Sequence, residues 1–191
     1  MNDLIIIVVW AIVSYLVGTI SAGDLVARTA GVDIRTRGTK NPGAANIYRE
    51  LGPKYGVAVF LLDITKGALA TMPLLVMGIP TWGRLVAGVA VVLGHQFPMY
   101  SKRPGGTGMA TAIGTTAGLA PFGVLGGAPA AILTLLISKN SGYTGAVLFV
   151  VTALLVGLFR QDLVGALGVV GVAAIAFVKA RFQYAGDSTA E

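Results

Sequence analysis

Long apolar runs dominate this chain and limit the folds that are open to it. An α-helix needs about 20 apolar residues to cross the hydrocarbon core of a bilayer, and seven runs approach that length. Helices satisfy every backbone polar group inside such a core. The sequence therefore predicts an all-α polytopic membrane protein with seven transmembrane helices, some short or broken. The expected spans are residues 4–22, 55–79, 82–97, 107–120, 122–138, 143–159 and 163–178.

The composition supports a membrane protein and excludes several other classes. Of the 191 residues, 55% are hydrophobic and 12% are charged, about half the charge that is usual in a soluble domain. No polar segment is long enough for a second domain, so we expect one transmembrane domain over residues 1–191. The chain has no cysteine and one histidine, so we expect no disulfide, no metal site and no cofactor.

Glycine is frequent in the apolar runs, where small residues let membrane helices approach closely. The spacings Gly114-x-x-x-Gly118 and Gly123-x-x-x-Gly127 predict two helix contact faces. The first run has only Asp3 before it and lacks the basic start of a secretory signal, so we expect a retained helix.

Positive charge is distributed unevenly between the two sides that seven spans define. Most lysines and arginines lie in residues 23–54, 98–106, 139–142 and the C-terminal segment, whereas the other side holds only Arg84 and Arg160. The positive-inside rule places the basic side in the cytoplasm, with the N-terminus outside and the C-terminus cytoplasmic. Loops that face anionic lipid account for the net charge of +6, so no nucleic-acid partner is expected.

The first basic loop contains a segment suited to binding an anion. Its glycines allow the backbone to expose N–H groups, its asparagines supply amide donors, and its cations add fixed charge. An alternative is a solvated loop of turn formers whose cations face lipid. The candidate residues are Gly38, Thr39, Lys40, Asn41, Gly43, Asn46 and Arg49.

The second basic loop joins the only histidine to a glycine-rich turn. His95 ends one span, and Gly105-Gly106-Thr107-Gly108 opens the next. Backbone N–H groups and the helix dipole at such a turn favour a phosphate, although the Lys-Ser/Thr of a Walker A loop is absent. His95 is suited to hydrogen-bond a phosphate or an attacking hydroxyl; the alternative is a helix-capping or interfacial histidine.

Two ionisable residues interrupt the second span. Asp63 and Lys66 are three apart, so on a helix they share a face and can pair. Ionisable groups inside a span usually face a partner or a cavity. Either the two satisfy each other, or a short break brings them to the surface, or Lys66 reaches an anionic substrate with Asp63 holding it in place.

At these residues the chain resembles the PlsY-type bacterial glycerol-3-phosphate acyltransferases. The matching stretches are GTKNPGAANIYRELGPKYG at 38–56, Asp63-x-x-Lys66-Gly67, and GHQFPMYSKRPGGTGMAT at 94–111. Their order and spacing fit the family over roughly residues 5–120. Beyond residue 120, only the hydropathy and the number of spans continue the match.

The resemblance implies a multi-pass enzyme of the bacterial inner membrane with its active site facing the cytoplasm. Such an enzyme transfers an acyl chain from acyl phosphate to the 1-hydroxyl of glycerol 3-phosphate, giving lysophosphatidic acid for phospholipid biosynthesis. It uses no coenzyme A, acyl carrier protein or metal. The candidate catalytic residues are His95 and Asn46. The candidate substrate-binding residues are Gly38, Thr39, Lys40, Asn41, Gly43, Arg49, Asp63, Lys66, Gly105, Gly106, Thr107 and Gly108.

The chain departs from the family pattern in both loops. Pro104 and Thr107 stand where the second motif usually has lysines, and in the first motif Thr39-Lys40 replaces Ser-Gly and Ala45 replaces threonine. Lys40, Lys102 and Arg103 are available to supply displaced positive charge. Two other functions stay open: a diverged, non-catalytic binder of phospholipid or phosphate, and a small transporter with ionisable residues in a broken span.

Overall fold

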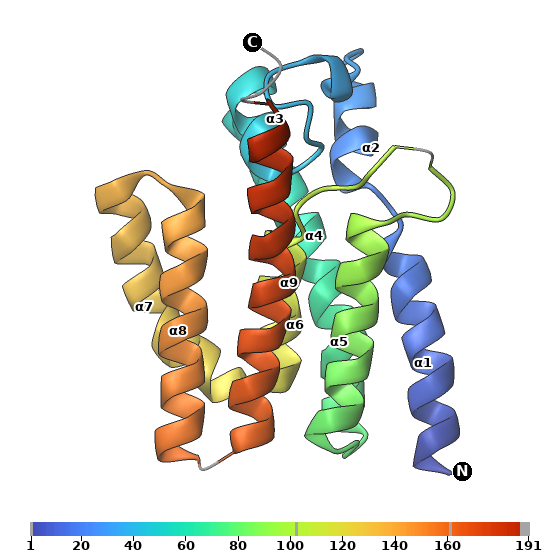
Figure 1. Cartoon of the computed structure of the whole chain (residues 1–191), viewed down its shortest axis with the longest axis vertical. Helices are drawn as coiled ribbons and strands as arrows, with labels where there is room; N and C mark the ends of the chain where they lie inside the picture. Colours follow the sequence, from blue (N-terminus) through green and yellow to red (C-terminus); the bar gives the residue numbers. More distant parts are fainter. Residues whose placement is uncertain (1, 102, 161, 188–191) are drawn as a thin grey trace.

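The protein is a bundle of helices that run along the long axis of the molecule (Figure 1). Residues 2–101, 103–160 and 162–187 are described in a computed structural model. Within those ranges the chain forms nine α-helices and one 3-10 helix, with no strand. The all-helical class expected from the apolar runs is therefore confirmed.

The helices follow the predicted runs closely. The elements are α1 (Asp3–Gly18), α2 (Ala22–Thr29), the 3-10 helix η1 (Ile34–Thr36), α3 (Ala44–Leu51), α4 (Pro53–Val76), α5 (Thr81–Gln96), α6 (Met109–Leu119), α7 (Pro121–Ser138), α8 (Ser141–Phe159) and α9 (Leu163–Asp187). The basic loop 23–54 is largely helical, since it contains most of α2 together with η1 and α3.

Five stretches are long and apolar enough to cross a membrane: 3–29, 53–76, 121–138, 141–159 and 163–182. The remaining two predicted spans correspond to α5, with 16 residues, and α6, with 11 residues. At 1.5 Å per residue, α6 extends only about 16 Å, roughly half of a hydrocarbon core. All seven runs are helical, and the number of complete crossings stays a prediction.

The first apolar run breaks between α1 and α2. The Thr19 hydroxyl donates to a carbonyl one turn earlier at 2.6 Å, and the Ser21 hydroxyl accepts an N–H from the first turn of α2. The break leaves the Ile20 carbonyl outside both helices, where it accepts a hydrogen bond from the Lys66 ammonium at 3.1 Å. The break between α1 and α2 thus provides a hydrogen-bond acceptor for Lys66, which lies inside α4.

Glycines bring two helix pairs into backbone contact. A Cβ at Gly67 of α4 would overlap the Thr111 carbonyl of α6, and a Cβ at Gly114 of α6 would overlap the Ile64 carbonyl of α4. Gly18 of α1 and Gly94 of α5 make the same kind of reciprocal contact. The register between these helices is therefore set by main chain against main chain.

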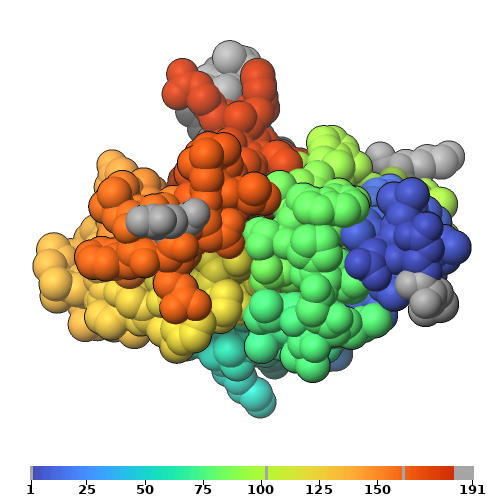
Figure 2. Space-filling view, turned by 90° about the horizontal axis from the view of Figure 1, so that it is seen from below, coloured from blue at the N-terminus to red at the C-terminus, as the bar shows by residue number. Residues whose placement is uncertain are grey.

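The two glycine spacings singled out in the sequence are both contact faces, as predicted. Gly114 and Gly118 of α6 face α4, and Gly123 and Gly127 of α7 face α8 around Thr152. Figure 2 shows two of the helix pairs that glycines bring together, α1 beside α5 and α7 beside α8, at one end of the molecule.

Candidate active site

The first motif loop, residues 37–43, is shaped by the side chain of Asn46. This side chain is buried in the first turn of α3; its amide donates to the carbonyls of Arg37 (3.1 Å) and Asn41 (3.0 Å). Its oxygen accepts the N–H of Thr39 at 3.1 Å. Gly38 has φ +52°, and a Cβ there would overlap the Asn46 oxygen. Asn46 and Gly38 therefore fit together to fold this loop.

The same loop presents the start of α3. Lys40 adopts φ +54°, a left-handed conformation that is uncommon for lysine, and its side chain is exposed. Asn41 is buried, and its oxygen accepts the N–H of Gly43 at 3.1 Å. Gly43 is the N-cap of α3 and no side chain of the described residues caps that end. The Asn46 N–H donates to the Gly43 carbonyl, which leaves the N–H groups of Ala44 and Ala45 available.

The second motif loop, residues 97–108, folds back against the end of α5. The Gly105 N–H donates to the Gln96 carbonyl at 2.9 Å. The buried Gln96 amide donates to the carbonyls of Thr107 (2.8 Å) and Ile175 (3.1 Å), which ties the turn to α9. Gly108 has φ +84° and starts α6, again without a side-chain cap among the described residues.

The two motif loops meet at Gly106. A Cβ on Gly106 would lie 2.5 Å from Nε2 of His95 and 3.4 Å from the side-chain oxygen of Asn41. No acceptor in the described ranges pairs with the N–H groups of Gly106 and Thr107. The loops that lead into α3 and α6 thus meet beside the only histidine, with these N–H groups between them, an arrangement that favours an anion.

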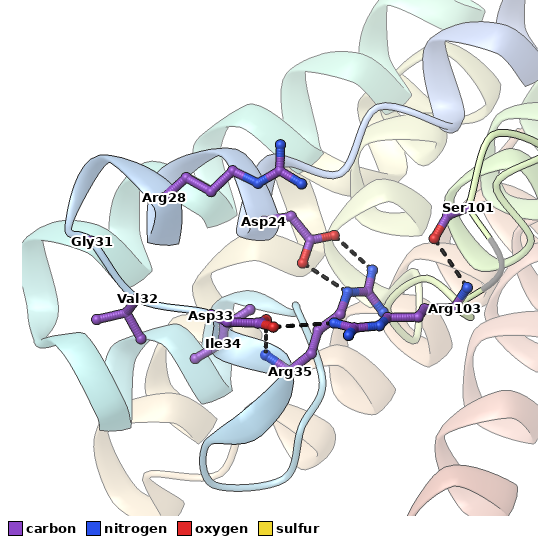
Figure 3. Close-up of a pocket in the computed structure, with 9 residues that line it drawn as sticks. All are labelled: Asp24, Arg28, Gly31, Val32, Asp33, Ile34, Arg35, Ser101 and Arg103. Atoms are coloured by element: carbon purple, nitrogen blue, oxygen red, sulfur yellow. Dashed lines mark hydrogen bonds and ion pairs between the residues drawn. The ribbon is translucent and has the colours of Figure 1, made fainter.

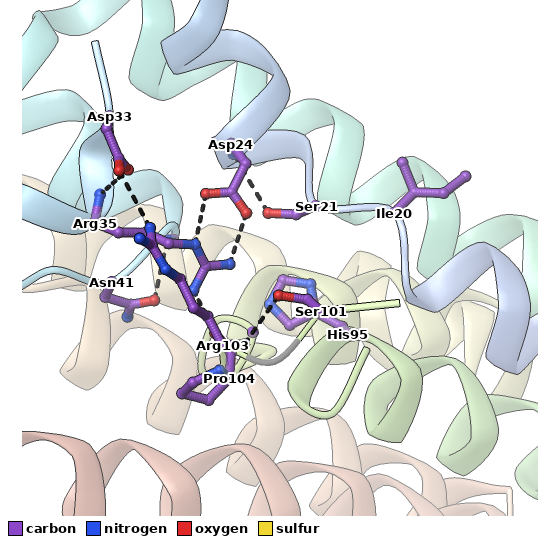
Figure 4. Close-up of polar contacts among 12 residues, drawn as sticks. Ile20, Ser21, Asp24, Asp33, Arg35, Asn41, His95, Ser101, Arg103 and Pro104 are labelled. Atoms are coloured by element: carbon purple, nitrogen blue, oxygen red, sulfur yellow. Dashed lines mark hydrogen bonds and ion pairs between the residues drawn. The ribbon is translucent and has the colours of Figure 1, made fainter. Parts of the chain in front are cut away.

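The guanidinium of Arg35, in η1, joins α2 to the second motif loop (Figure 4). Its Nε and Nη2 donate to the two carboxylate oxygens of Asp24 at 2.8 and 2.6 Å, and its Nη1 donates to the Pro104 carbonyl at 2.6 Å. Such bidentate pairing fixes the guanidinium plane. Pro104, one of the positions that depart from the family pattern, is therefore held by a cation through its carbonyl.

Lys179 of α9 contacts the other side of the same loop. Its ammonium donates to the carbonyls of Gly105 (3.2 Å) and Gln96 and lies 4.6 Å from the centre of the Phe97 ring. In the sequence, Lys179 and Arg35 are predicted only to lie among the cations of the cytoplasmic side. Their distance along the chain from the loop left no motif that could have assigned them to it.

Asp63, Lys66 and His95 form a buried cluster between α4 and α5. Lys66 Nζ lies 2.7 Å from Asp63 Oδ1 and 2.7 Å from His95 Nδ1. The pair expected from the three-residue spacing is confirmed, and His95 joins it. All three side chains are at most 8% exposed, so the charges are satisfied by one another and by the Ile20 carbonyl rather than by water.

The remaining candidate cations lie apart from this cluster. The side chains of Lys40 and Arg49 are exposed. Arg103 is also exposed and pairs with Asp33 at 3.2 Å, while Lys102 lies outside the described residues. The structure thus groups Asn41, His95 and the glycine turn, with Asp63 and Lys66 behind them. Substrate-binding roles for Lys40 and Arg49 stay predictions.

A pocket of about 510 Å³ opens between the α2–η1 segment and the second motif loop (Figure 3). Arg35 lines it and also donates to the carbonyl of Pro104, the residue before the glycine turn. The Arg35 backbone N–H and then the Arg103 side chain lower the pKa of Asp33 at its rim. Its charged and hydroxyl lining residues are Asp24, Arg28, Asp33, Arg35, Ser101 and Arg103.

The fold and the site together define a helical membrane protein with two N–H-rich loops around a buried histidine. The family model described as glycerol-3-phosphate acyltransferase matches residues 8–185. The chain belongs to this family.

Individual relatives agree with that assignment. The glycerol-3-phosphate acyltransferase of Aquifex aeolicus (strain VF5) is 43% identical over 111 residues, which are 58% of this chain and 58% of the relative. Glycerol-3-phosphate acyltransferase 5 of Dehalococcoides mccartyi (strain ATCC BAA-2266 / KCTC 15142 / 195) is 31% identical over 180 residues, 94% of this chain and 67% of the relative. The match to the Aquifex protein therefore spans less than two thirds of that relative.

A solved structure shows the same fold. The crystal structure of PlsY (YgiH), an integral membrane glycerol 3-phosphate acyltransferase, in its glycerol 3-phosphate form superposes with a TM-score of 0.83 at 29% identity. The match covers 96% of this chain and 92% of that one. The lysophosphatidic acid form gives a TM-score of 0.78 at 28% identity. The structural match thus extends beyond the motif region into the C-terminal helices.

Proposed function

We propose that this protein is an acyltransferase of phospholipid biosynthesis. It transfers an acyl chain from acyl phosphate to the 1-hydroxyl of glycerol 3-phosphate, giving lysophosphatidic acid and phosphate. One observation carries the proposal: the two motif loops, which lead into α3 and α6, meet at Gly106 beside His95. Both substrates carry a phosphate, and free N–H groups at helix N-termini bind phosphate.

The reaction asks for alignment and charge stabilisation. The hydroxyl oxygen of glycerol 3-phosphate attacks the carbonyl carbon of acyl phosphate, and a new C–O ester bond forms. The bond between that carbon and the phosphate oxygen breaks, and the departing phosphate takes the hydroxyl proton. N–H groups of Gly106 and Thr107 and the His95 ring are placed to stabilise the negative charge that develops on oxygen.

The substrates' phosphates face the basic side of the membrane in this proposal. Seven crossings would place the N-terminus outside and the C-terminus in the cytoplasm of a bacterial cell. The start of α1 and the end of α9 lie at opposite ends of the long axis, as an odd number of crossings requires (Figure 1). In this topology α6, with 11 residues, is the shortest of the seven crossings.

Single-cysteine labelling tests this topology, because the chain has no cysteine of its own. Met77→Cys lies in the exposed turn before α5, and Ser101→Cys lies in the exposed part of the second motif loop. A membrane-impermeant maleimide should label Met77→Cys in intact cells and Ser101→Cys only after permeabilisation. The reverse pattern would invert the orientation.

The activity is tested with purified protein in detergent or lipid, given acyl phosphate and labelled glycerol 3-phosphate. Lysophosphatidic acid should form, and His95→Ala should abolish it. Asn140→Ala, which removes the side-chain cap of α8 at a distance from the site, is the matched asparagine control for Asn46→Ala. Phosphate-ligand binding without product would overturn the proposal in favour of a binder. Ligand uptake into sealed vesicles would favour a transporter.

A further inference from the structure

The hydrogen bonds of the Lys66 ammonium determine which nitrogen of His95 carries the proton. An ammonium has three donors and no acceptor. Lys66 Nζ lies 2.7 Å from His95 Nδ1, 2.7 Å from Asp63 Oδ1 and 3.1 Å from the Ile20 carbonyl. The Ile20 carbonyl and His95 Nδ1 are hydrogen-bond partners of the ammonium, whereas Asp63 Oδ1 forms an ion pair with it that lacks hydrogen-bond geometry. An ammonium can only donate a hydrogen bond. His95 Nδ1 accepts, so the proton of the neutral ring is on Nε2.

The carboxylate of Asp63 does not bind the imidazole directly. The distance from Asp63 Oδ1 to His95 Nδ1 is 3.6 Å, beyond a normal hydrogen bond. In an Asp–His dyad the carboxylate would hold the proton on Nδ1, and the free Nε2 lone pair would act as a base. Here Lys66 forms an ion pair with Asp63 and a hydrogen bond with His95 Nδ1, and the tautomer is reversed.

The Nε2–H of His95 faces the place where the two motif loops meet. A Cβ on Gly106 would lie 2.5 Å from Nε2, so glycine at this position leaves the ring edge open. The free N–H groups of Gly106 and Thr107 belong to the same turn. His95 thus adds a third donor to a set of donors.

We propose that Lys66, oriented by Asp63 and the Ile20 carbonyl, is a positioning residue that fixes His95 as the Nε2–H tautomer. In this state His95 donates a hydrogen bond to a substrate oxygen and does not act as the general base. The identity of that oxygen, on the phosphate or on the carbonyl under attack, rests on the proposed function. The tautomer itself does not.

Lys66 is consequently distinct from a lysine that binds substrate. Its ammonium contacts three protein groups, two by hydrogen bonds and one by an ion pair, and its side chain is 8% exposed. The substrate-binding role predicted for Lys66 would require it to leave Asp63 or His95. The positioning role needs no such movement.

The tautomer is measurable in isolation because His95 is the only histidine. Protein labelled with ¹⁵N-histidine, in detergent or nanodiscs without substrate, should show a protonated, pyrrole-type signal at Nε2 and a pyridine-type signal at Nδ1. Lys66→Met should move the Nδ1 signal toward the protonated type. Lys54→Met, which removes an exposed lysine at the start of the same helix, should leave the spectrum unchanged.

A wild-type spectrum with the proton on Nδ1 would overturn the inference, whether or not the variants fold. It would leave the proposed acyl transfer untouched. Conversely, absence of acyl transfer with the expected spectrum would sink the proposed function and leave the tautomer standing. The two failures are therefore distinguishable.

Kinetics separate positioning from substrate binding. Lys66→Met should lower kcat by about 100-fold, the effect of losing one preorganised donor, with a KM for glycerol 3-phosphate close to that of the wild type. A raised KM with kcat retained would show that Lys66 binds substrate and would contradict the positioning role. Asp63→Asn, which keeps an oxygen near Lys66, should retain more activity than Lys66→Met.

Discussion

The first motif loop is held by a side chain from the adjoining helix, whereas the second is held by side chains from distant parts of the chain. Asn46 makes three hydrogen bonds within residues 37–41. The second loop depends on Arg35 at Pro104 and on Lys179 at Gly105, contacts that span 69 and 74 residues. The first loop is thus a local structure, whereas the second combines the local bonds of Gln96 with contacts that form only in the assembled bundle.

This difference predicts how each loop fails. Removing the Asn46 side chain takes a hydrogen-bond partner from several backbone groups of the first loop at once. Removing one distant support leaves the other in place. Variants of the first loop should therefore be more damaging than single variants of the second.

Asn46→Ala should have the largest effect. It leaves the Asn41 carbonyl and the Thr39 N–H without their partner and the Arg37 carbonyl with only the Lys40 N–H. Displacement of the loop should lower kcat/KM for acyl transfer by about 100-fold or more. Steady-state assays on purified protein measure this. If Asn46→Ala is as active as the control Asn140→Ala, the first loop keeps its conformation without the Asn46 side chain, which would contradict this prediction.

Arg35→Met should have the next largest effect, because it breaks the bond to Pro104 and leaves Asp24 unpaired. We expect a loss of about tenfold in kcat/KM, the equivalent of about 1.4 kcal/mol. Arg35→Lys keeps the charge but cannot make the bidentate pair, so it should recover only part of the loss. Full recovery with lysine would mean that charge alone matters.

Lys179→Met should cost less, about threefold in kcat/KM, because Gln96 still ties the turn to α9. The double variant with Arg35→Met sharpens the comparison. If the two supports act on one loop, their combined loss should exceed the sum of the separate free-energy changes. Simple additivity would show that the loop does not depend on them jointly.

Asp33 should contribute the smallest effect. Its pKa in the folded protein is lowered by the Arg35 N–H and by Arg103, so its contribution to stability is present above the ordinary aspartate range. That contribution is lost as the pH falls through the lowered folded-state value. The difference in melting temperature between wild type and Asp33→Asn should be small at neutral pH and disappear in acid. A difference that grows in acid would contradict the assignment.

Much of the fold was predictable because hydropathy alone marks helices in a membrane protein. The break between α1 and α2 was not predictable, since residues 4–22 carry no charge and form one apolar run in hydropathy. The interruption depends on Thr19 and Ser21 bonding to nearby backbone. The Asp63–Lys66 pair followed from helical spacing. The contact of His95 with this pair could not be predicted, because it depends on how α4 and α5 are aligned along their axes.

The candidate site likewise contains residues that the sequence predicted and residues that only the structure identifies. Asn41, Asn46 and the glycine turn were visible as motifs, whereas Arg35 and Lys179 are far from the turn in sequence. The replacements at Pro104 and Thr107 remove cations from the second loop, and the structure places these two other cations against the carbonyls of the same turn. Only tertiary contacts bring them there.

The glycine contacts between α4 and α6, and between α1 and α5, bear on how mutational data for this protein are read. Gly67, Gly114, Gly18 and Gly94 have no room for even one methyl group. In a saturation library they should be as intolerant as His95, although they take no part in the chemistry. Intolerance to substitution would therefore mark the helix–helix contacts as strongly as the catalytic centre. Only assays that measure protein abundance separately from turnover would distinguish the two kinds of position.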